Sequence, residues 1–445
     1  MKISLIKSSE IFTPLRMDGK YHLSDGMVVR DEIMKSPYKC CTIGDVTSKI
    51  YCPGIFHRNY VQSGTPFLGG GDILRKNLDS GKFLTKTHTP NHETLIIPKF
   101  CTLVTCGGTI GNTVFASERL SACWASQHVM RVIPNEKIKE GMLCAYLSSR
   151  QGYLLLTTNT YGSVIPTLNS ESIASIPIPE FPQTFQSIVD SMLKESAKER
   201  DLALDKLEES IKIFDNYLSS PDILKRGCIK SKSIFSKHIR FDAQYQFEKM
   251  IEEHENQNLE EIPITSCAVR IYVGNRGKRY YVNKGIYFLS SSDMMLFNPK
   301  RFSSMISSRT PSLSNLKVEE KDILISRSGT VGNCIFVNEN LKDVTVSEHA
   351  LRLRINNAVI EPEYVFAYLN TSQGRRKLVN SAYGSVIVTL GEDYVGEIKL
   401  PILSKEERKK IVNNIVAYSE AMAKAETLES EAISLVEKEI DSWSK

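Results

Sequence analysis

The sequence lacks several features that would place it in whole classes of protein. Among its 445 residues no run approaches the roughly 20 apolar residues of a membrane span, and the N-terminal stretch MKISLIKSSEIF has no apolar core of signal-peptide length. The ten cysteines include no Cys-x-x-Cys pair, so we expect small buried thiols in a reducing compartment. We therefore predict a soluble cytoplasmic protein without a membrane partner.

Signatures of catalysis are missing as well. The chain has no P-loop, Gly-x-Ser-x-Gly, His-Glu-x-x-His or kinase signature, no Rossmann Gly-x-Gly, and no Asn/Asp-Pro-Pro-aromatic tetrapeptide of amino-methyltransferases. Glu319-Glu-Lys321 could imitate the end of a nuclease carboxylate cluster. Cys101 with Cys106 and His88 with His92 could suggest zinc ligands, but neither pair recurs in the other half. We predict no catalytic residue, metal or cofactor in this chain.

What the chain does have is an internal repeat, because the same motifs occur twice in the same order. The main matches are Arg16-Met-Asp18-Gly-Lys-Tyr21 with Arg240-Phe-Asp242-Ala-Gln-Tyr245, Arg58-Asn-Tyr60-Val61 with Arg279-Tyr-Tyr281-Val282, Gly108-Thr-Ile-Gly111-Asn112 with Gly329-Thr-Val-Gly332-Asn333, Ser126-Gln-His128 with Ser347-Glu-His349, and Tyr161-Gly-Ser-Val-Ile165 with Tyr383-Gly-Ser-Val-Ile387. Since the offsets stay between 221 and 224, each half is one structural unit. The segments between the matches differ, as expected either of two heads with different targets or of drift after duplication.

Each half begins with a mixed region and ends in a long helix. Short β-branched and aromatic runs bounded by Gly, Pro, Asn and Ser predict strands, with short helices between them. We therefore expect an α+β fold of two similar domains in pseudo-twofold tandem, separated by two long helices that form an antiparallel coiled coil. The predicted boundaries are 1–182 and 221–402 for the domains, and 183–220 and 403–445 for the spacer helices.

The helices are predicted from apolar residues that recur mostly every three or four positions in segments rich in Lys and Glu. At 1.5 Å per residue, about 35 residues span about 50 Å, which is long for a helix that covers only its own domain. We expect each helix to pair with the other. The predicted seam residues are Val189, Leu193, Leu204, Leu207, Ile211, Phe214, Leu218, Ile411, Ile415, Tyr418, Met422, Leu428 and Leu435.

Candidate DNA-binding residues lie mainly where the two copies differ. The net charge of +5 permits an anionic partner without requiring one, but basic and aromatic residues cluster in these variable segments. The repeated Gly-Thr-(Ile/Val)-Gly-Asn turn either holds a phosphate with its backbone N–H groups or serves as a structural hairpin. The candidates are Arg58, Asn59, Tyr60, Lys82, Lys86, His88, Thr109, Asn112, Arg276, Lys278, Arg279, Tyr280, Lys300, Arg301, Arg309, Arg327, Ser328 and Thr330.

Taken in order and twice over, these motifs resemble the specificity subunit of a type I restriction–modification system. The features that carry the resemblance are Arg16-x-Asp18-x-x-Tyr21, Phe67-Leu68-x-Gly70-Gly71-Asp72-Ile73, the two glycine turns, and the Tyr-Gly-Ser-Val-Ile segments that precede Pro179 and Pro401. The resemblance covers essentially the whole chain. The family's Pro-x-x-x-Gln entry to the helix is imperfect here, since the second half offers Glu406, Glu407 and Arg408 in place of glutamine.

The resemblance implies a protein without catalytic activity that reads double-stranded DNA. Each domain would recognise one half of a split, asymmetric site, and the paired helices would fix the gap. Two methyltransferase (modification) subunits and two motor-nuclease (restriction) subunits would dock on the chain. These partners would bring S-adenosylmethionine, ATP and Mg.

Other functions compete with this one. The chain could be a two-headed adaptor that binds proteins and no DNA, which the small net charge favours. It could also serve a related methylation-based phage-defence system, or be an enzyme that uses Glu319 and Lys321.

Overall fold

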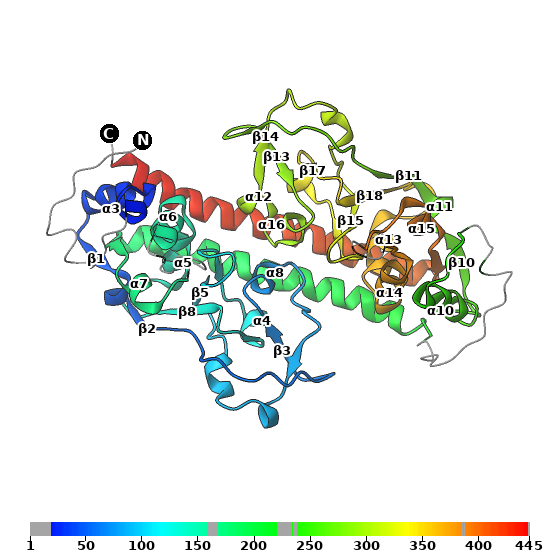
Figure 1. The fold of residues 1–445 in the computed structure, drawn as a ribbon, viewed down its shortest axis with the longest axis horizontal. Coiled ribbons are helices and arrows are strands. Elements are labelled where there is room, and N and C mark those ends of the chain that lie inside the picture. The colour runs from blue at the N-terminus through cyan, green and yellow to red at the C-terminus, as the bar shows by residue number, and fades with distance from the viewer. Residues whose placement is uncertain are drawn as a thin grey trace. The chain divides into compact units, whose positions relative to one another are not determined.

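The computed structural model describes residues 19–158, 160, 167–219, 234, 238–384, 386 and 388–443 (Figure 1). Arg16, Asp18 and the repeat segment 161–165 lie outside these residues, as does part of its second copy. The chain divides into two compact units. Unit 1 is Met1–Asp201 with Lys424–Lys445, and unit 2 is Leu202–Ala423.

Unit 1 alternates short strands with short helices. Its elements are α2 (Gly19–His22), α3 (Asp25–Met34), β1 (Cys40–Thr42), η1 (Ile43–Val46), β2 (Thr47–Tyr51), β3 (Thr65–Leu68), η2 (Asp72–Leu74), β4 (Phe83–Leu84), η3 (Lys86–His88), η4 (His92–Leu95), β5 (Thr102–Thr105), β6 (Thr113–Phe115), α4 (Glu118–Ser121), β7 (Trp124–Ala125), β8 (Val129–Pro134), α5 (Glu140–Ser148), α6 (Arg150–Thr158), α7 (Ser170–Ala174), β9 (Pro177–Pro179) and the start of α8 (Gln183–Asp215).

Unit 2 follows the same plan. Its elements are α10 (Ala243–Glu252), β10 (Glu260–Pro263), α11 (Ile264–Cys267), β11 (Ala268–Val273), β12 (Tyr281–Val282), β13 (Ile286–Leu289), η5 (Asp293–Met295), α12 (Pro299–Phe302), β14 (Ser304–Ile306), η6 (Leu313–Asn315), β15 (Ile323–Ser326), β16 (Cys334–Phe336), η7 (Glu339–Leu341), β17 (Thr345–Val346), β18 (Ala350–Ile355), α13 (Pro362–Leu369), α14 (Ser372–Ser381), α15 (Glu392–Glu397), β19 (Lys399–Ile402) and the start of α16 (Lys405–Ser442).

The sheets of the two units repeat the same topology. The main sheet has the order β2-β8-β5-β6 in unit 1 and β11-β18-β15-β16 in unit 2, and all its strand pairs are antiparallel. A second sheet contains a parallel pair, β3 with β7 and β13 with β17. The short pairs β1-β9 and β10-β19 join the start of each domain to the strand before its long helix. The repeat in the sequence is thus a repeat in structure.

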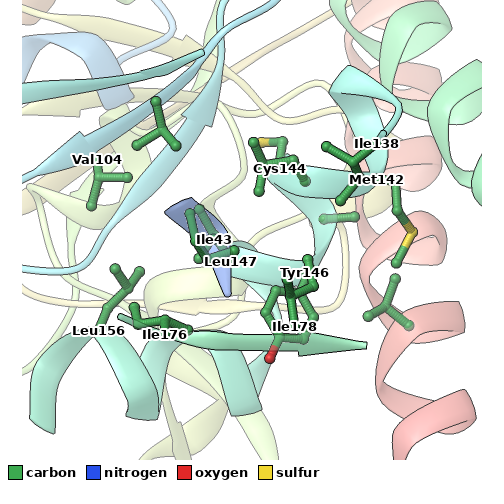
Figure 2. Packing of buried hydrophobic residues seen from close by; sticks show 14 of the residues in the cluster. Ile43, Val104, Ile138, Met142, Cys144, Tyr146, Leu147, Leu156, Ile176 and Ile178 are labelled. Carbon is green, nitrogen blue, oxygen red and sulfur yellow. The ribbon is translucent and has the colours of Figure 1, made fainter. Parts of the chain in front are cut away.

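Apolar residues between the main sheet and the helices form the core of each unit. Every residue of β5 and β15 is buried. Both are inner strands of the main sheet, and one face of each packs against α5 or α13, whereas Leu324 on the other face of β15 belongs to a second apolar cluster with Leu289 and Val344. Figure 2 shows the core of unit 1, where sheet residues such as Val104 meet helix residues such as Leu147 and the β9 residue Ile178. The core therefore fixes the sheet whose loops carry the candidate site.

The two long helices contact each other within each unit. In unit 1, Ser196 Oγ of α8 donates a 2.7 Å hydrogen bond to the Ala425 carbonyl of α16. In unit 2, Phe214 of α8 belongs to the same core as Ile415 of α16. The first part of α8 shares a unit with the last part of α16, and the last part of α8 shares a unit with the first part of α16. The helices therefore run antiparallel. These findings confirm the predicted fold class, two similar α+β domains in tandem with a pair of long helices.

The predicted seam residues lie mostly in these cores. The buried ones are Val189, Leu193, Leu204, Phe214, Ile411, Ile415, Tyr418 and Met422, and the half-buried ones are Leu207, Ile211, Leu218, Leu428 and Leu435. The boundary between the units falls inside both helices, and the predicted domain boundaries stay predictions.

Candidate nucleic-acid interface

An arginine that follows the first strand of the main sheet contacts the same two positions in both units. In unit 1, Arg58 Nη2 donates a 2.7 Å hydrogen bond to Gln127 Oε1, and its guanidinium lies over the Phe67 ring with its carbon 5.4 Å from the centroid. Arg279, Glu348 and Phe288 are the residues 221 positions later. The Arg279 guanidinium lies 5.6 Å from the Phe288 centroid, and its Nη2 is 3.6 Å from the Glu348 carboxylate.

An exposed tyrosine accompanies each of these arginines. Tyr60 lies 6.2 Å from Phe67 between ring centroids, and Tyr281 lies 6.2 Å from Phe288. Tyr60 is 47% exposed and Tyr281 is 61% exposed. Aromatic rings that remain open to solvent beside a guanidinium are suited to stacking on nucleobases.

A histidine completes the arrangement in both units. His128 Nε2 is 3.3 Å from Gln127 Nε2, and His349 Nδ1 is 2.7 Å from Ser328 Oγ. Gly107 occupies the position equivalent to Ser328, and a Cβ atom there would lie only 2.6 Å from His128 Nδ1. The residue before the glycine turn therefore decides how each imidazole is held.

We call these residues the arginine cluster of each unit. The cluster of unit 1 is Arg58, Tyr60, Phe67, Gln127 and His128, and that of unit 2 is Arg279, Tyr281, Phe288, Glu348 and His349.

A hollow adjoins the arginine cluster of unit 2. A cavity of about 490 Å³ is lined by Val273, Gly274, Asn275, Arg276, Arg327, Ser328, Glu348, His349 and Thr389. It brings together three predicted residues, Arg276, Arg327 and Ser328. Arg276 Nε is 3.5 Å from Glu348, whereas Arg327 Nε donates a 3.0 Å hydrogen bond to the Leu390 carbonyl. Its wall thus carries cations, a carboxylate, a hydroxyl and an imidazole.

A buried arginine supports the strand end that carries each cluster. Arg131 of β8 donates from Nη1 to the Ser126 carbonyl at 3.1 Å and from Nη2 to the Ala125 carbonyl at 2.6 Å, directly before Gln127. Arg352 of β18 donates to the Ala350 and Leu316 carbonyls at 3.2 Å each and also to the Val346 carbonyl. Burial lowers the pKa of each guanidinium group below the usual value for arginine. Each charge is held by peptide dipoles that fix the loop in place.

The glycine turns use backbone groups internally. Gly111 N–H donates to the Thr105 carbonyl and Asn112 N–H to the Thr105 hydroxyl, and Ser326 takes the same part for Gly332 and Asn333. Gly108 and Gly111 have φ angles of +79° and +86°, which explains the glycines. These contacts support the structural-hairpin alternative for those N–H groups.

The other predicted contact residues are spread over the loops of their units. Exposed side chains are those of Asn59, Lys82, Lys86, His88, Thr109, Arg276, Lys278, Tyr280, Arg309 and Thr330, whereas Lys300 and Arg301 are half-buried and Asn112 is buried. Lys300 Nζ lies 5.5 Å from the Tyr287 ring, and Arg301 lies 4.8 Å from the Phe302 ring.

The candidate enzyme and zinc residues have other contacts. Glu319 forms an ion pair of 2.7 Å with Arg354, and Lys321 forms one of 2.9 Å with Glu363. His92 stacks on Trp124 with centroids 5.4 Å apart. Among the residues that the structure describes, no group of three or more His, Cys, Asp or Glu side chains could hold a metal ion. No helix of the described chain is long and apolar enough to cross a membrane.

Comparison with known families decides the membership of the chain. A family model described as "Type I restriction modification DNA specificity domain" matches residues 35–192 and 275–433. The chain belongs to this family. Each match contains one arginine cluster, so both clusters lie in specificity domains, and membership gives the chain a role in DNA sequence specificity.

Solved structures with similarity to the chain include subunits of such systems. The S subunit of a type I restriction–modification system from M. genitalium is 14% identical, with a TM-score of 0.35 over 91% of this chain and 96% of that one. The HsdS subunit from Thermoanaerobacter tengcongensis is 12% identical, with a TM-score of 0.29 and coverages of 91% and 96%. A chain from a structure of type I R-M complex assembly is 13% identical, with a TM-score of 0.30 and coverages of 91% and 98%. Comparison with curated proteins gives no match.

Sequence reasoning missed seven of the ten members of the two arginine clusters, which are Phe67, Gln127, His128, Tyr281, Phe288, Glu348 and His349. Gln127, His128, Glu348 and His349 recur at an offset of 221, but they are outside the basic segments that guided the prediction. The signal that could have found them is the pairing of a recurring arginine with a recurring Ser-(Gln/Glu)-His segment.

Proposed function

We propose that this chain is a non-catalytic cytoplasmic subunit that reads a bipartite, asymmetric site in double-stranded DNA. Each unit reads one half-site, and α8 and α16 set the gap between the half-sites. The observation that carries the proposal is the arginine cluster, which occurs twice on the same frame with Gln127 in one copy and Glu348 in the other. A shared frame with different polar residues is what two readers of different base sequences require.

The proposed partners supply the chemistry. Two methyltransferase subunits, with S-adenosylmethionine, and two motor-nuclease subunits, with ATP and Mg²⁺, dock on the chain. The surrounding residues of the clusters offer phosphate contacts through Lys82 and Lys86 in unit 1 and through Lys278 and Arg309 in unit 2, all of which are exposed.

A salt titration tests DNA binding. The full chain is titrated with labelled duplex DNA at several salt concentrations, and the affinity is expected to fall steeply with salt because bound counterions are released. Lys82→Ala and Lys86→Ala should each make the negative slope of log K against log[salt] shallower by about one. Lys198→Ala, an exposed lysine of α8, is the matched control and should leave the slope unchanged.

A deletion tests the role of the helices. Removing seven residues from each long helix, next to the Ser196–Ala425 contact, shortens a helix by about 10 Å, or roughly three base pairs of duplex. The gap in the recognised sequence should shorten, and both half-sites should stay the same. Altered half-sites with an unaltered gap would contradict the proposal.

The adaptor remains the alternative of a different class, since the net charge is only +5. It predicts no DNA affinity at any salt concentration. A subunit of a methylation-based phage-defence system would bind DNA in the same way and differ only in its partners.

A further inference from the structure

We propose that Gln127 and Glu348 are the base-reading residues of the two arginine clusters and present opposite hydrogen-bonding groups. Gln127 donates a hydrogen bond to a base acceptor, which guanine, thymine and adenine present in the major groove and cytosine does not. Glu348 accepts one from an amino base, cytosine or adenine. The inference rests on the proposed function and names one base-contacting position in each unit.

The contacts of Gln127 turn its oxygen toward Arg58 and leave a donor for a ligand. A guanidinium has donors and no acceptor, so the amide atom that faces Arg58 at 2.7 Å must be the oxygen. The amide nitrogen then points away from Arg58, where it lies 3.3 Å from His128 Nε2. An amide nitrogen has two hydrogens, so one remains for a ligand after the contact with His128.

The contacts of Glu348 leave only an acceptor available. Arg276 Nε lies 3.5 Å from Oε1, Arg279 Nη2 lies 3.6 Å from Oε2, and His349 Nε2 lies 3.9 Å from Oε1. A carboxylate has no donor and about four lone-pair positions. The side chain of Glu348 is 21% exposed at the wall of the cavity, so lone pairs remain for a ligand there.

The bases differ in whether their major-groove edges present hydrogen-bond donors or acceptors. In the major groove, guanine presents the acceptors N7 and O6, thymine presents O4 and adenine presents N7, whereas cytosine and adenine present amino groups. A side chain that presents a donor therefore rejects cytosine, and an acceptor-only side chain rejects guanine and thymine. The tyrosines beside the clusters, Tyr60 and Tyr281, offer stacking that does not depend on the base.

Exchanging the two residues tests the inference. Three full-length proteins each select duplexes from a randomised DNA library: the wild type, Gln127→Glu and Glu348→Gln. The bound sequences are then determined. In Gln127→Glu, Arg58 still holds one oxygen and the other becomes an acceptor, so at one base of one half-site the frequency of cytosine should rise and those of guanine and thymine should fall. Glu348→Gln should have the reverse effect at one base of the other half-site. We expect each preference to shift by roughly 10- to 100-fold.

Matched variants control for the change in charge. Gln183→Glu at the start of α8 and Glu253→Gln at the end of α10 alter exposed residues outside the clusters and should select the wild-type sequence. Variants that bind DNA and leave the frequencies of cytosine, guanine and thymine unchanged at every position would overturn the inference and leave the proposed function standing. Failure of the wild-type chain to select any sequence would overturn both.

Discussion

The arginine clusters of the two units have equivalent parts, but they hold the central polar residue differently. In unit 1 a neutral amide, Gln127, is oriented by Arg58, and Gly107 makes room for His128. In unit 2 a carboxylate, Glu348, lies between two arginines, and Ser328 bonds to His349. The shared fold thus fixes the position of this residue in each unit. Whether it is Gln127 or Glu348 determines which hydrogen-bonding groups are presented there.

A contact between the domain and its long helix also differs between the units. Lys76 and Glu426 form a buried ion pair of 2.8 Å in unit 1. The equivalent positions in unit 2 are Phe297 and Leu204, which are buried and apolar. Two units of one topology therefore reach similar packing with different interactions, and substitutions can measure how different they are.

The largest effect is expected from the buried arginine of unit 1. Arg131→Met removes the donor to the carbonyls of Leu95, Ala125, Ser126 and Val129. Since each buried carbonyl that loses its partner costs roughly 1–3 kcal/mol, the free energy of unfolding should fall by more than about 4 kcal/mol. Denaturation followed by tryptophan fluorescence measures it, because both tryptophans, Trp124 and Trp443, belong to unit 1.

Arg352→Met is the matched variant in unit 2. It breaks hydrogen bonds to three carbonyls and should mainly shift the transition seen by circular dichroism, with a smaller shift in fluorescence. Equal shifts of the fluorescence midpoint in the two variants would show that the units do not unfold separately.

The buried ion pair of unit 1 should give the next largest effect. Lys76→Met leaves the Glu426 carboxylate buried without its lysine and should cost about 3–4 kcal/mol by the same fluorescence assay. The double variant Lys76→Met with Glu426→Leu imitates the apolar pair of unit 2 and should recover most of the loss. A double variant as unstable as the single one would contradict this comparison.

A smaller effect, on base preference, is expected when the arginine of each cluster is substituted, and it should differ between the units. Arg58→Ala frees the Gln127 amide to turn over, so that it offers either donor or acceptor, and its base preference should relax by roughly tenfold. Arg279→Ala should keep the preference for amino bases, because both ends of a carboxylate are acceptors and Arg276 remains beside it. Selection from the randomised library reads both outcomes, and equal relaxation would contradict the assigned polarity.

Much of this fold could be predicted because its signals are local. The repeat offsets predicted two like-built units, and apolar periodicity predicted helices that the structure places at Gln183–Asp215 and Lys405–Ser442. The periodicity was less informative near the end of α16. There Glu426 and Glu429 are buried, and the deeply buried apolar residues include Val436 and Ile440. Charged residues on the buried face hide the periodic signal.

The site was harder to predict because its residues come from distant segments. Arg58 was found from its basic neighbourhood, but Gln127 is 69 positions away and gains its meaning only from their contact. Asn112 was proposed as a contact residue from the motif alone, and its side chain is buried beside the turn. Spacing along the chain identifies a turn, whereas packing decides which of its groups remain open to solvent.

The smallest effect is expected where the units cap a short helix differently. In unit 1, Thr42 and Asp45 form a capping box at η1, whereas α11 in unit 2 starts at Pro263 without a side-chain cap. The hydrogen bonds from the Thr42 hydroxyl and backbone N–H lower the pKa of Asp45. A carboxyl whose pKa is lower in the folded state stabilises the fold above its unfolded pKa of about 3.9, and this stabilisation is lost as the pH falls through the folded value.

Asp45→Asn should therefore lower the fluorescence midpoint slightly at neutral pH and much less below about pH 3. Asp31→Asn, an exposed change on α3, is the matched control for the loss of one surface carboxylate. If the two variants followed the same pH dependence, the capping box would contribute nothing beyond the charge. If only the Asp45 variant lost stability at neutral pH, the capping box would stabilise a turn in unit 1. Unit 2 forms the equivalent turn without such a cap.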